Sequence, residues 1–164
     1  MNRYEEADDS LVEVFLNVME ERFPQYQFLK FKLVYDMKKR VKGGKVVLAS
    51  IELASPKIKF FSQDEKAADG YDYILFVDQN AWKLSSDKDK VRLISHELRH
   101  VFVDEYGKPK LVGHEIEDFY QEIKLNADDP EWGRKLVSLI TDVYDQEKEA
   151  AKDKKKERNN GRRD

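Results

Sequence analysis

The stretch "LISHELRHVFVDEYGKPKLVGHEIEDF", residues 93–119, contains all three histidines of the chain: His96, His100 and His114. The first two enclose a glutamate in "HELRH", which has the form H-E-x-x-H found in zinc hydrolases. A shared metal ion is the commonest physical reason for several imidazoles to lie close together. The stretch therefore predicts a metal site, and the rest of the chain has to supply a fold that carries it.

The "HELRH" segment has the periodicity of a helix with one packed face and one open face. At about 100° per residue, His96, Glu97 and His100 fall within one arc, and the opposite side carries Ile94, Leu98, Val101 and Phe102. Two histidines four residues apart on a rigid helix direct two ring nitrogens toward one point. Glu97 then lies beside that point, where it can accept a proton from the attacking water instead of binding the metal. The alternative is an ordinary amphipathic helix with two surface histidines.

The third ligand must come from further along the chain. Val103 and Tyr106 occupy the positions where a metzincin carries glycine and histidine, so that arrangement is excluded. The residues 101–114 read as a strand, a turn and a return, which would bring His114 back toward the first two histidines. Carboxylates on the following predicted helix, 114–125, are the other candidates, as in zinc enzymes with two histidines and a glutamate. We prefer His114 and keep Glu117 and Glu122 as alternatives.

One further residue of that predicted helix has a candidate role. Asp118 lies about 40° from His114 around the helix. It could accept a hydrogen bond from a ligand imidazole, and a plain solvent-facing role is the alternative.

The composition limits the classes of protein that remain. The chain has 164 residues, of which 38% are charged, and it has no cysteine. Disulfide frameworks, zinc fingers and cysteine nucleophiles are therefore excluded, and a metal must be held by imidazole and carboxylate. The N-terminus is too charged for a signal peptide, and no apolar run is long enough to span a bilayer. We expect a cytoplasmic protein that does not bind a membrane.

The expected domain organisation is one domain over residues 1–147 and a charged tail over residues 148–164. The tail contains eight basic and four acidic residues, and it should be a frayed helix end that runs into disorder. The net charge of −3 argues against nucleic-acid binding, although a weak contact of nucleic acid with the basic tail is left open. No oligomeric state is indicated.

The remaining patterns predict an α+β fold. A helix is expected over residues 10–23, with Ser10 and Glu13 in capping-box positions, and it should stop before Pro24. Residues 28–41 and 45–55 flank Gly43-Gly44 and predict two antiparallel strands joined by a tight turn. Shorter strands are expected at 57–61 and at 71–78, giving one twisted, mostly antiparallel sheet of about four strands. Ser86 and Asp89 should cap the helix that carries "HELRH", and further helices are expected at 114–125 and 130–149.

The segments "DYILFVDQNAWKLSSDKDKVRLISHELRHV" and "LVGHEIEDFY" resemble the phage metallopeptidase domain, found in phage and prokaryotic proteins, and are more distantly similar to SprT-like zinc proteases. The resemblance covers roughly residues 30–125. It implies a zincin-like fold, Zn²⁺ bound by His96, His100 and His114, and Glu97 as the catalytic base. It also implies that the strand before the active-site helix, residues 71–78, is the sheet edge that binds substrate. No zinc ribbon or DNA-binding module follows, so DNA-linked proteolysis is not expected.

These patterns together predict a zinc-dependent metallopeptidase of the H-E-x-x-H type that hydrolyses a protein or peptide substrate. The alternative function is a non-catalytic, zinc-binding regulatory or interaction protein of the same fold. Glu97 distinguishes the two, since a purely structural metal site needs no acid beside it.

Overall fold

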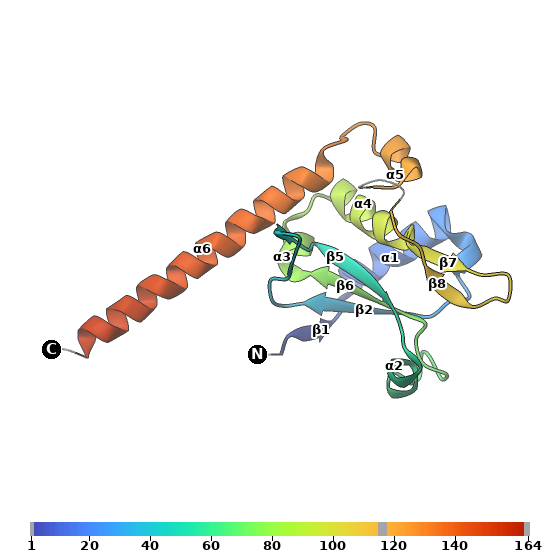
Figure 1. The fold of residues 1–164 in the computed structure, drawn as a ribbon, viewed down its shortest axis with the longest axis horizontal. Coiled ribbons are helices and arrows are strands. Elements are labelled where there is room, and N and C mark those ends of the chain that lie inside the picture. The colour runs from blue at the N-terminus through green and yellow to red at the C-terminus, as the bar shows by residue number, and fades with distance from the viewer. Residues whose placement is uncertain (1, 115–117, 163–164) are drawn as a thin grey trace.

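The fold comes from a computed structural model, which describes residues 2–114 and 118–162. Its elements along the chain are β1 (Tyr4–Glu6), α1 (Asp9–Arg22), a 3-10 turn (Pro24–Tyr26), β2 (Phe31–Asp36), β3 (Val41–Lys42), β4 (Lys45–Val46), β5 (Ala49–Leu53), α2 (Pro56–Phe61), β6 (Tyr73–Asp78), α3 (Gln79–Leu84), α4 (Asp87–Leu98), β7 (Val101–Val103), β8 (Pro109–Leu111), α5 (Tyr120–Leu125) and α6 (Trp132–Gly161). The expected α+β class is confirmed (Figure 1).

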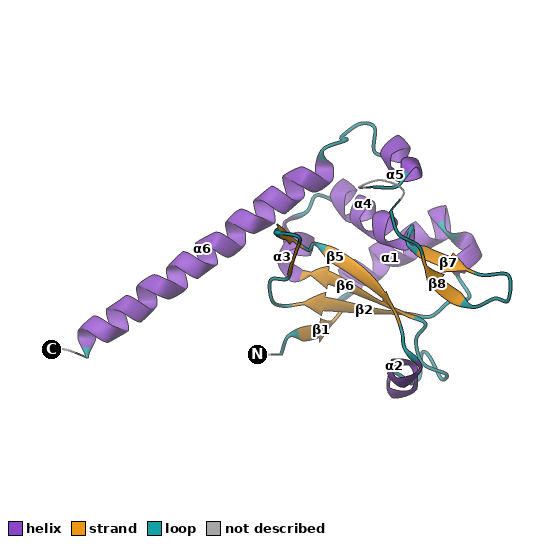
Figure 2. Cartoon of the chain, viewed as in Figure 1, coloured by secondary structure: helices purple, strands orange, loops and turns teal. Residues whose placement is uncertain are grey.

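The central sheet has four strands in the order β1-β2-β6-β5. It is mixed, because β2 and β6 pair in parallel whereas the two outer pairings are antiparallel. The helices α1 and α4 contact each other, and α4 also contacts β5, so these helices pack on one side of the sheet (Figure 2). The hydrophobic core lies in this layer.

Strand β6 is central, which corrects the expectation that residues 71–78 form an exposed edge. Tyr73, Leu75 and Val77 of β6 are completely buried and face the helical layer. An uninterrupted apolar strand of this kind is stable only between two neighbours. The expected strand β6 is confirmed, but β5 is the edge on this side of the sheet.

The turn at Gly43-Gly44 is confirmed, although its arms are shorter than predicted. Both glycines have positive φ angles, 59° and 76°, and they connect β3 to β4 in a small separate hairpin. The longer strands β2 and β5 belong to the central sheet, where β6 lies between them. Apolar alternation identified the strands but could not identify their neighbours.

Two other expectations about the sheet are wrong. Residues 57–61 are not a strand, because Ser55 caps the short helix α2 by accepting a hydrogen bond from the Ile58 amide, with Pro56 in the first turn. The fourth strand is instead β1, which pairs with β2 and consists of three exposed residues, two of them charged. Neither its length nor its pattern distinguished it from a disordered N-terminus.

The helix ends agree with the sequence at α4 and differ at α1. Ser86 caps α4 by accepting from the Asp89 amide, as expected. Helix α1 ends before Pro24 as expected, but Asp8 is its cap and Ser10 lies inside the helix. The Ser10 hydroxyl accepts a hydrogen bond from the indole of Trp82, which joins α1 to α3.

Helix α6 continues through Gly161, past Lys148, where the charged tail was expected to begin as a frayed helix end (Figure 1). Alternating lysine, glutamate and alanine are good helix formers and can form i,i+4 charge pairs, so the helix continues without packing. The last buried residue of α6 is Tyr144, and every described residue from Asp145 onward is exposed. The division at residue 147 stays a prediction. None of the described helices is both long enough and apolar enough to cross a membrane.

Gly70 allows α2 to lie close to the start of β6. It has a φ angle of 84°, and a Cβ atom there would lie 1.8 Å from the carbonyl oxygen of Lys59. We expect Gly70→Ala to reduce the free energy of unfolding by about 2–4 kcal/mol through strain and overlap. The control is Gly133→Ala in α6, where a Cβ meets nothing within 4 Å and should be neutral or slightly stabilising. Urea unfolding followed by circular dichroism measures both, and equal stabilities would contradict the packing described.

Candidate metal centre

Helix α4 supplies the first half of the histidine cluster. Leu93, Ile94 and Leu98 are buried in the core, which fixes the rotation of the helix. Residues His96 and Glu97 lie in its last turn. The helix is shorter than predicted: it ends at Leu98, and His100 follows in a turn in which its amide donates to the Glu97 carbonyl.

The hairpin of β7 and β8 holds His100. In the hairpin register Val101 lies opposite Leu111, so Val112 lies opposite His100. The Val112 amide donates to the His100 carbonyl at 2.7 Å, and the Val112 carbonyl lies 2.7 Å from His100 Nδ1. The ring therefore donates from Nδ1, which leaves the lone pair of Nε2 free.

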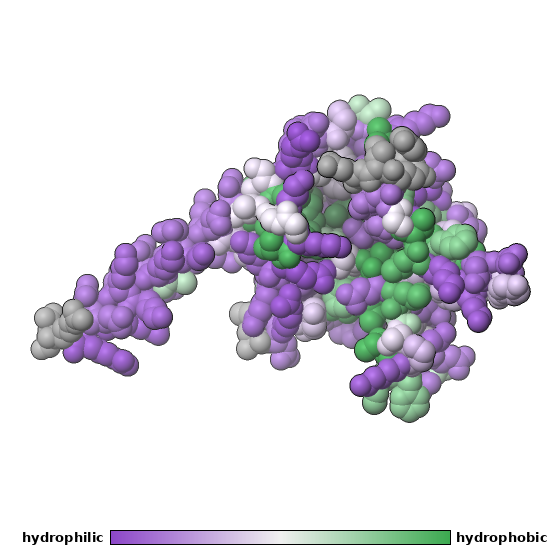
Figure 3. Space-filling view, viewed as in Figure 1, coloured by the Kyte–Doolittle hydropathy of each residue, from purple (hydrophilic) through white to green (hydrophobic). Residues whose placement is uncertain are grey.

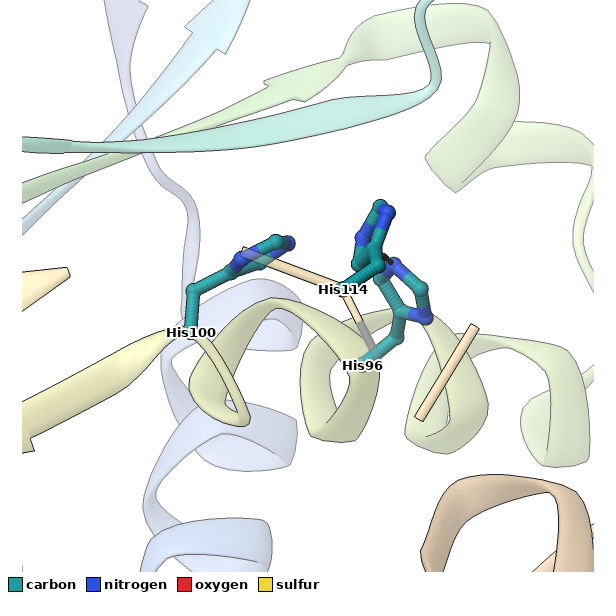
Figure 4. A group of neighbouring side chains, drawn as sticks. All are labelled: His96, His100 and His114. Atoms are coloured by element: carbon teal, nitrogen blue, oxygen red, sulfur yellow. Dashed lines mark hydrogen bonds between the residues drawn. The ribbon is translucent and has the colours of Figure 1, made fainter. Parts of the chain in front are cut away.

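The same hairpin brings His114 to the other histidines, as the sequence predicted. His114 lies two residues beyond Val112, and its Nε2 is 2.9 Å from His96 Nε2. One ring nitrogen from each histidine lies within 4.8 Å of the other two (Figure 4). His114 does not begin a helix, since residues 112–114 are irregular and α5 begins only at Tyr120.

Asp118 and Phe119 complete the surroundings of the imidazoles. Asp118 Oδ1 lies 2.7 Å from His96 Nδ1, so this ring also donates from Nδ1 and keeps Nε2 free. The proposed contact of Asp118 with an imidazole is present, although neither residue 114 nor residue 118 is helical. Phe119 is buried and packs against all three histidine rings at centroid distances of 5.0–5.5 Å. No sequence pattern indicated this role, because it depends on how Phe119, at the start of α5, packs on a distant part of the chain.

Glu97 is the other acid near the cluster. It is only 7% exposed, and among the described residues no hydrogen bond to another side chain involves its carboxylate. Burial raises the pKa of Glu97 to about 8, and the positive charge of Arg40 opposes this shift. A divalent cation held by the adjacent imidazoles would lower this pKa. A buried acid without a structural partner is typical of a functional site.

Two of the three imidazoles, those of His100 and His114, favour their neutral forms. Burial lowers the pKa of His100, and the nearby His96 adds to this effect. Burial also lowers the pKa of His114, with contributions from both other histidines. Neutral imidazoles are the form that binds a metal ion, so the lowered pKa values of these two rings favour metal binding.

The two glutamates that were alternatives to His114 as the third ligand, Glu117 and Glu122, have different outcomes. Glu122 is completely buried, and its Oε1 accepts hydrogen bonds from Ser95 and Arg99, so this carboxylate is already bound elsewhere. Glu117 lies outside the described residues. Tyr106 is 80% exposed in the turn between β7 and β8.

The described residues fit a metal ion. Three ligands around tetrahedral zinc have nitrogen atoms about 3.3 Å apart, and the observed nitrogens lie within 4.8 Å of one another. His96 and His100 each use Nδ1 to contact an oxygen, which is the arrangement that orients metal-binding histidines. Three imidazoles without a thiolate suit zinc and related divalent ions.

A family model described as "Putative phage metallopeptidase" matches residues 3–144 of the chain. The chain belongs to this family. The match covers the central sheet, the three histidines and α6 as far as its last buried residue, Tyr144. No curated protein and no solved structure matches the chain.

Membership of the phage metallopeptidase family implies a metal, and the histidine cluster is a place that could hold it. The resemblance noted in the sequence is therefore confirmed at the level of the family. The individual roles of His96, Glu97, His100 and His114 stay predictions.

Asp118 should control the affinity for metal without binding it. We expect Asp118→Ala to weaken zinc binding by about 10–100-fold, because His96 loses the acceptor that orients its ring. Competition with a chromophoric chelator at pH 7.5 measures the affinity. The control is Asp145→Ala on the exposed part of α6, which should bind zinc as the wild type does. Equal affinities for the two variants would show that the contact between Asp118 and His96 does not matter.

Proposed function

We propose that this protein is a zinc-dependent metallopeptidase that hydrolyses peptide bonds with Glu97 as general base. The observation that carries the proposal is the convergence of three imidazole nitrogens, together with the buried Glu97 that follows His96 directly in the sequence and for which no side-chain partner is found among the described residues. The family to which the chain belongs supports a peptidase, and the zincin-like fold, the phage-related context and the cytoplasmic location are part of the proposal.

In the proposed site His96, His100 and His114 hold the ion through Nε2. When bound, zinc acts as a Lewis acid that polarises the scissile carbonyl and makes a water molecule more acidic. Asp118 and the Val112 carbonyl fix two of the rings, and Phe119 packs its apolar ring against all three.

Glu97 accepts the proton of the attacking water and returns it to the leaving amine. Its position in the last turn of α4, between the two histidines in sequence, supports this role. Its burial also supports it, because burial raises the pKa of Glu97 and a bound cation would lower it again, so that the carboxylate would titrate in the range where a general base is effective.

The substrate would bind in an extended conformation along β5. Among the described strands β5 pairs only with β6, so its outer backbone groups face away from the sheet. Figure 4 shows β5 passing next to the three histidines, and β5 contacts both α4 and β8. An added strand there would use main-chain hydrogen bonds, which recognise a polypeptide of many sequences.

Apolar side chains are exposed next to this edge, over β5, β8 and α2 (Figure 3). They are Leu53, Ile58, Phe60, Phe61, Leu111 and Val112. Their exposure supports a substrate with apolar residues beside the cleaved bond.

The competing function is a non-catalytic protein in which zinc only joins the hairpin to α4. A structural site of this kind uses four protein ligands and leaves no open position. Three histidines form the cluster among the described residues, which favours the catalytic alternative.

The purified protein should contain about one zinc ion per chain, as measured by elemental analysis.

His114→Ala should lose most of the zinc affinity, because two imidazoles alone bind the ion loosely. Far-UV circular dichroism checks that the variant is folded. A wild-type protein that neither contains zinc nor binds added zinc at neutral pH would refute the metal site, and a His114→Ala variant with full affinity would refute the third ligand.

Replacing Glu97 with Gln separates proton transfer from metal binding. The variant should bind zinc like the wild type, while hydrolysis of casein or of a quenched-fluorescence peptide library falls by a factor of about 10²–10⁴. Glu105→Gln, in the turn of the β7–β8 hairpin, is the control and should keep full activity. Loss of zinc from Glu97→Gln would make this residue a ligand, and retained hydrolysis would remove it from the mechanism.

A further inference from the structure

A buried polar cluster joins the C-terminal end of α4, which carries His96, to α5. The hydroxyl of Ser95 and the Nε atom of Arg99 each donate a 2.7 Å hydrogen bond to the same oxygen, Oε1 of Glu122. Ser95 and Glu122 are completely buried. We call these three residues the α4–α5 clasp.

The clasp also reaches α1. The guanidinium of Arg99 lies 4.6 Å from the ring centroid of Phe23, which follows α1 directly and is buried. Arg22, in the last turn of α1, places Nη1 4.0 Å from Oε2 of Glu122. The Glu122 carboxylate therefore lies between two guanidinium groups, that of Arg22 in α1 and that of Arg99 at the end of α4.

The position of the clasp in the sequence couples it to the histidines. Ser95 and Arg99 each precede a histidine by one residue, so the pair that holds Glu122 and the pair His96 and His100 alternate along the C-terminal end of α4 and the turn that follows it. A shift of Glu122 along α4 would thus be a shift relative to the histidines.

Glu122 is also linked to the histidines through its own segment, at the start of α5. Glu122 follows Phe119 by three residues and Asp118 by four, and these two residues contact the imidazoles. Helix α5 has only six residues, too few for independent stability, so its position depends on the contacts that hold it. Glu122 supplies the buried polar contact among them.

We propose that Glu122, acting through Ser95 and Arg99, is a positioning residue for the metal site. It fixes α5 against α4 and so holds Asp118 and Phe119 at the histidine rings. This inference rests on the proposed metal binding by the three histidines. It also assigns a role to Arg99, a position that the H-E-x-x-H pattern leaves open.

The first test compares zinc affinity in the full-length chain by chelator competition. Glu122→Gln keeps the shape of the side chain and removes its charge, and we expect zinc binding to weaken by about 10–100-fold. The matched control is Glu131→Gln, which removes the charge from an exposed glutamate that pairs with Arg134 at 3.2 Å. The control should stay within twofold of the wild type.

A second readout separates positioning from general stability. Cobalt replaces zinc in each variant, and the visible absorption bands report the geometry of the ligands. We expect altered bands in Glu122→Gln and unchanged bands in Glu131→Gln. A Glu122→Gln variant with a lower melting temperature but unchanged zinc affinity and cobalt spectrum would show a merely structural role and overturn the proposal.

A double-mutant cycle tests whether the clasp acts as a unit. Arg99→Gln and the double variant Arg99→Gln/Glu122→Gln should lose zinc affinity to the same extent as Glu122→Gln alone, and Arg99→Lys should restore part of it. Additive losses would overturn the proposal. If Glu122→Gln does not fold, Ser95→Ala removes a single hydrogen bond and should still weaken zinc binding several-fold, and an unchanged affinity would overturn the proposal.

The outcomes distinguish the clasp from the proposed function. A wild-type protein that binds no zinc overturns both. A wild-type protein that binds zinc but hydrolyses no peptide overturns only the peptidase, because the affinity comparison of the variants still decides the clasp.

Discussion

The pairing of His100 with Val112 is the interaction on which the candidate site depends. One hydrogen bond joins the Val112 amide to the His100 carbonyl, and the other joins the His100 ring to the Val112 carbonyl. Together they continue the ladder of the β7–β8 hairpin by one residue and fix the direction of a ring at the same time. The hydroxyl of Tyr73 lies 2.8 Å from the carbonyl of Lys110 and anchors the hairpin to the central strand β6. The position of His114 follows from this, because only one residue separates it from Val112.

The buried polar groups of α4 divide into two kinds. Ser95 and Arg92 have clear structural partners, Glu122 for the first and Asp89 and Asp128 for the second. Glu97 is as deeply buried, yet no such partner is found for it among the described side chains. Burying a carboxyl group without a hydrogen-bond partner lowers the stability of the fold. A protein that retains such a group is therefore expected to use it in binding or catalysis. This contrast within one helix supports a catalytic interpretation more strongly than the "HELRH" pattern alone.

Local patterns predicted the elements well where one residue type determines the geometry. Gly43-Gly44 supplied the positive φ angles of a turn, Ser86 capped α4, and the apolar run of β6 formed a buried strand. The pairing of strands was not predictable, since β2, β5 and β6 are all apolar and only their packing shows which is central. The cluster of three histidines was predictable from their spacing and the hairpin. Phe119 and the partner of Glu122 were not, because both depend on how a short helix docks on a distant one.

Helix α6 has a consequence for how the molecule behaves in solution. Its 30 residues make a rod of about 45 Å, of which the half after Tyr144 extends beyond the body of the protein (Figure 1). Such an extension adds friction out of proportion to its mass. The 19.4 kDa chain should therefore elute earlier from a sizing column than a sphere of equal mass, and an early peak is not by itself a sign of a dimer. Sedimentation equilibrium or light scattering, which do not depend on shape, report the true mass.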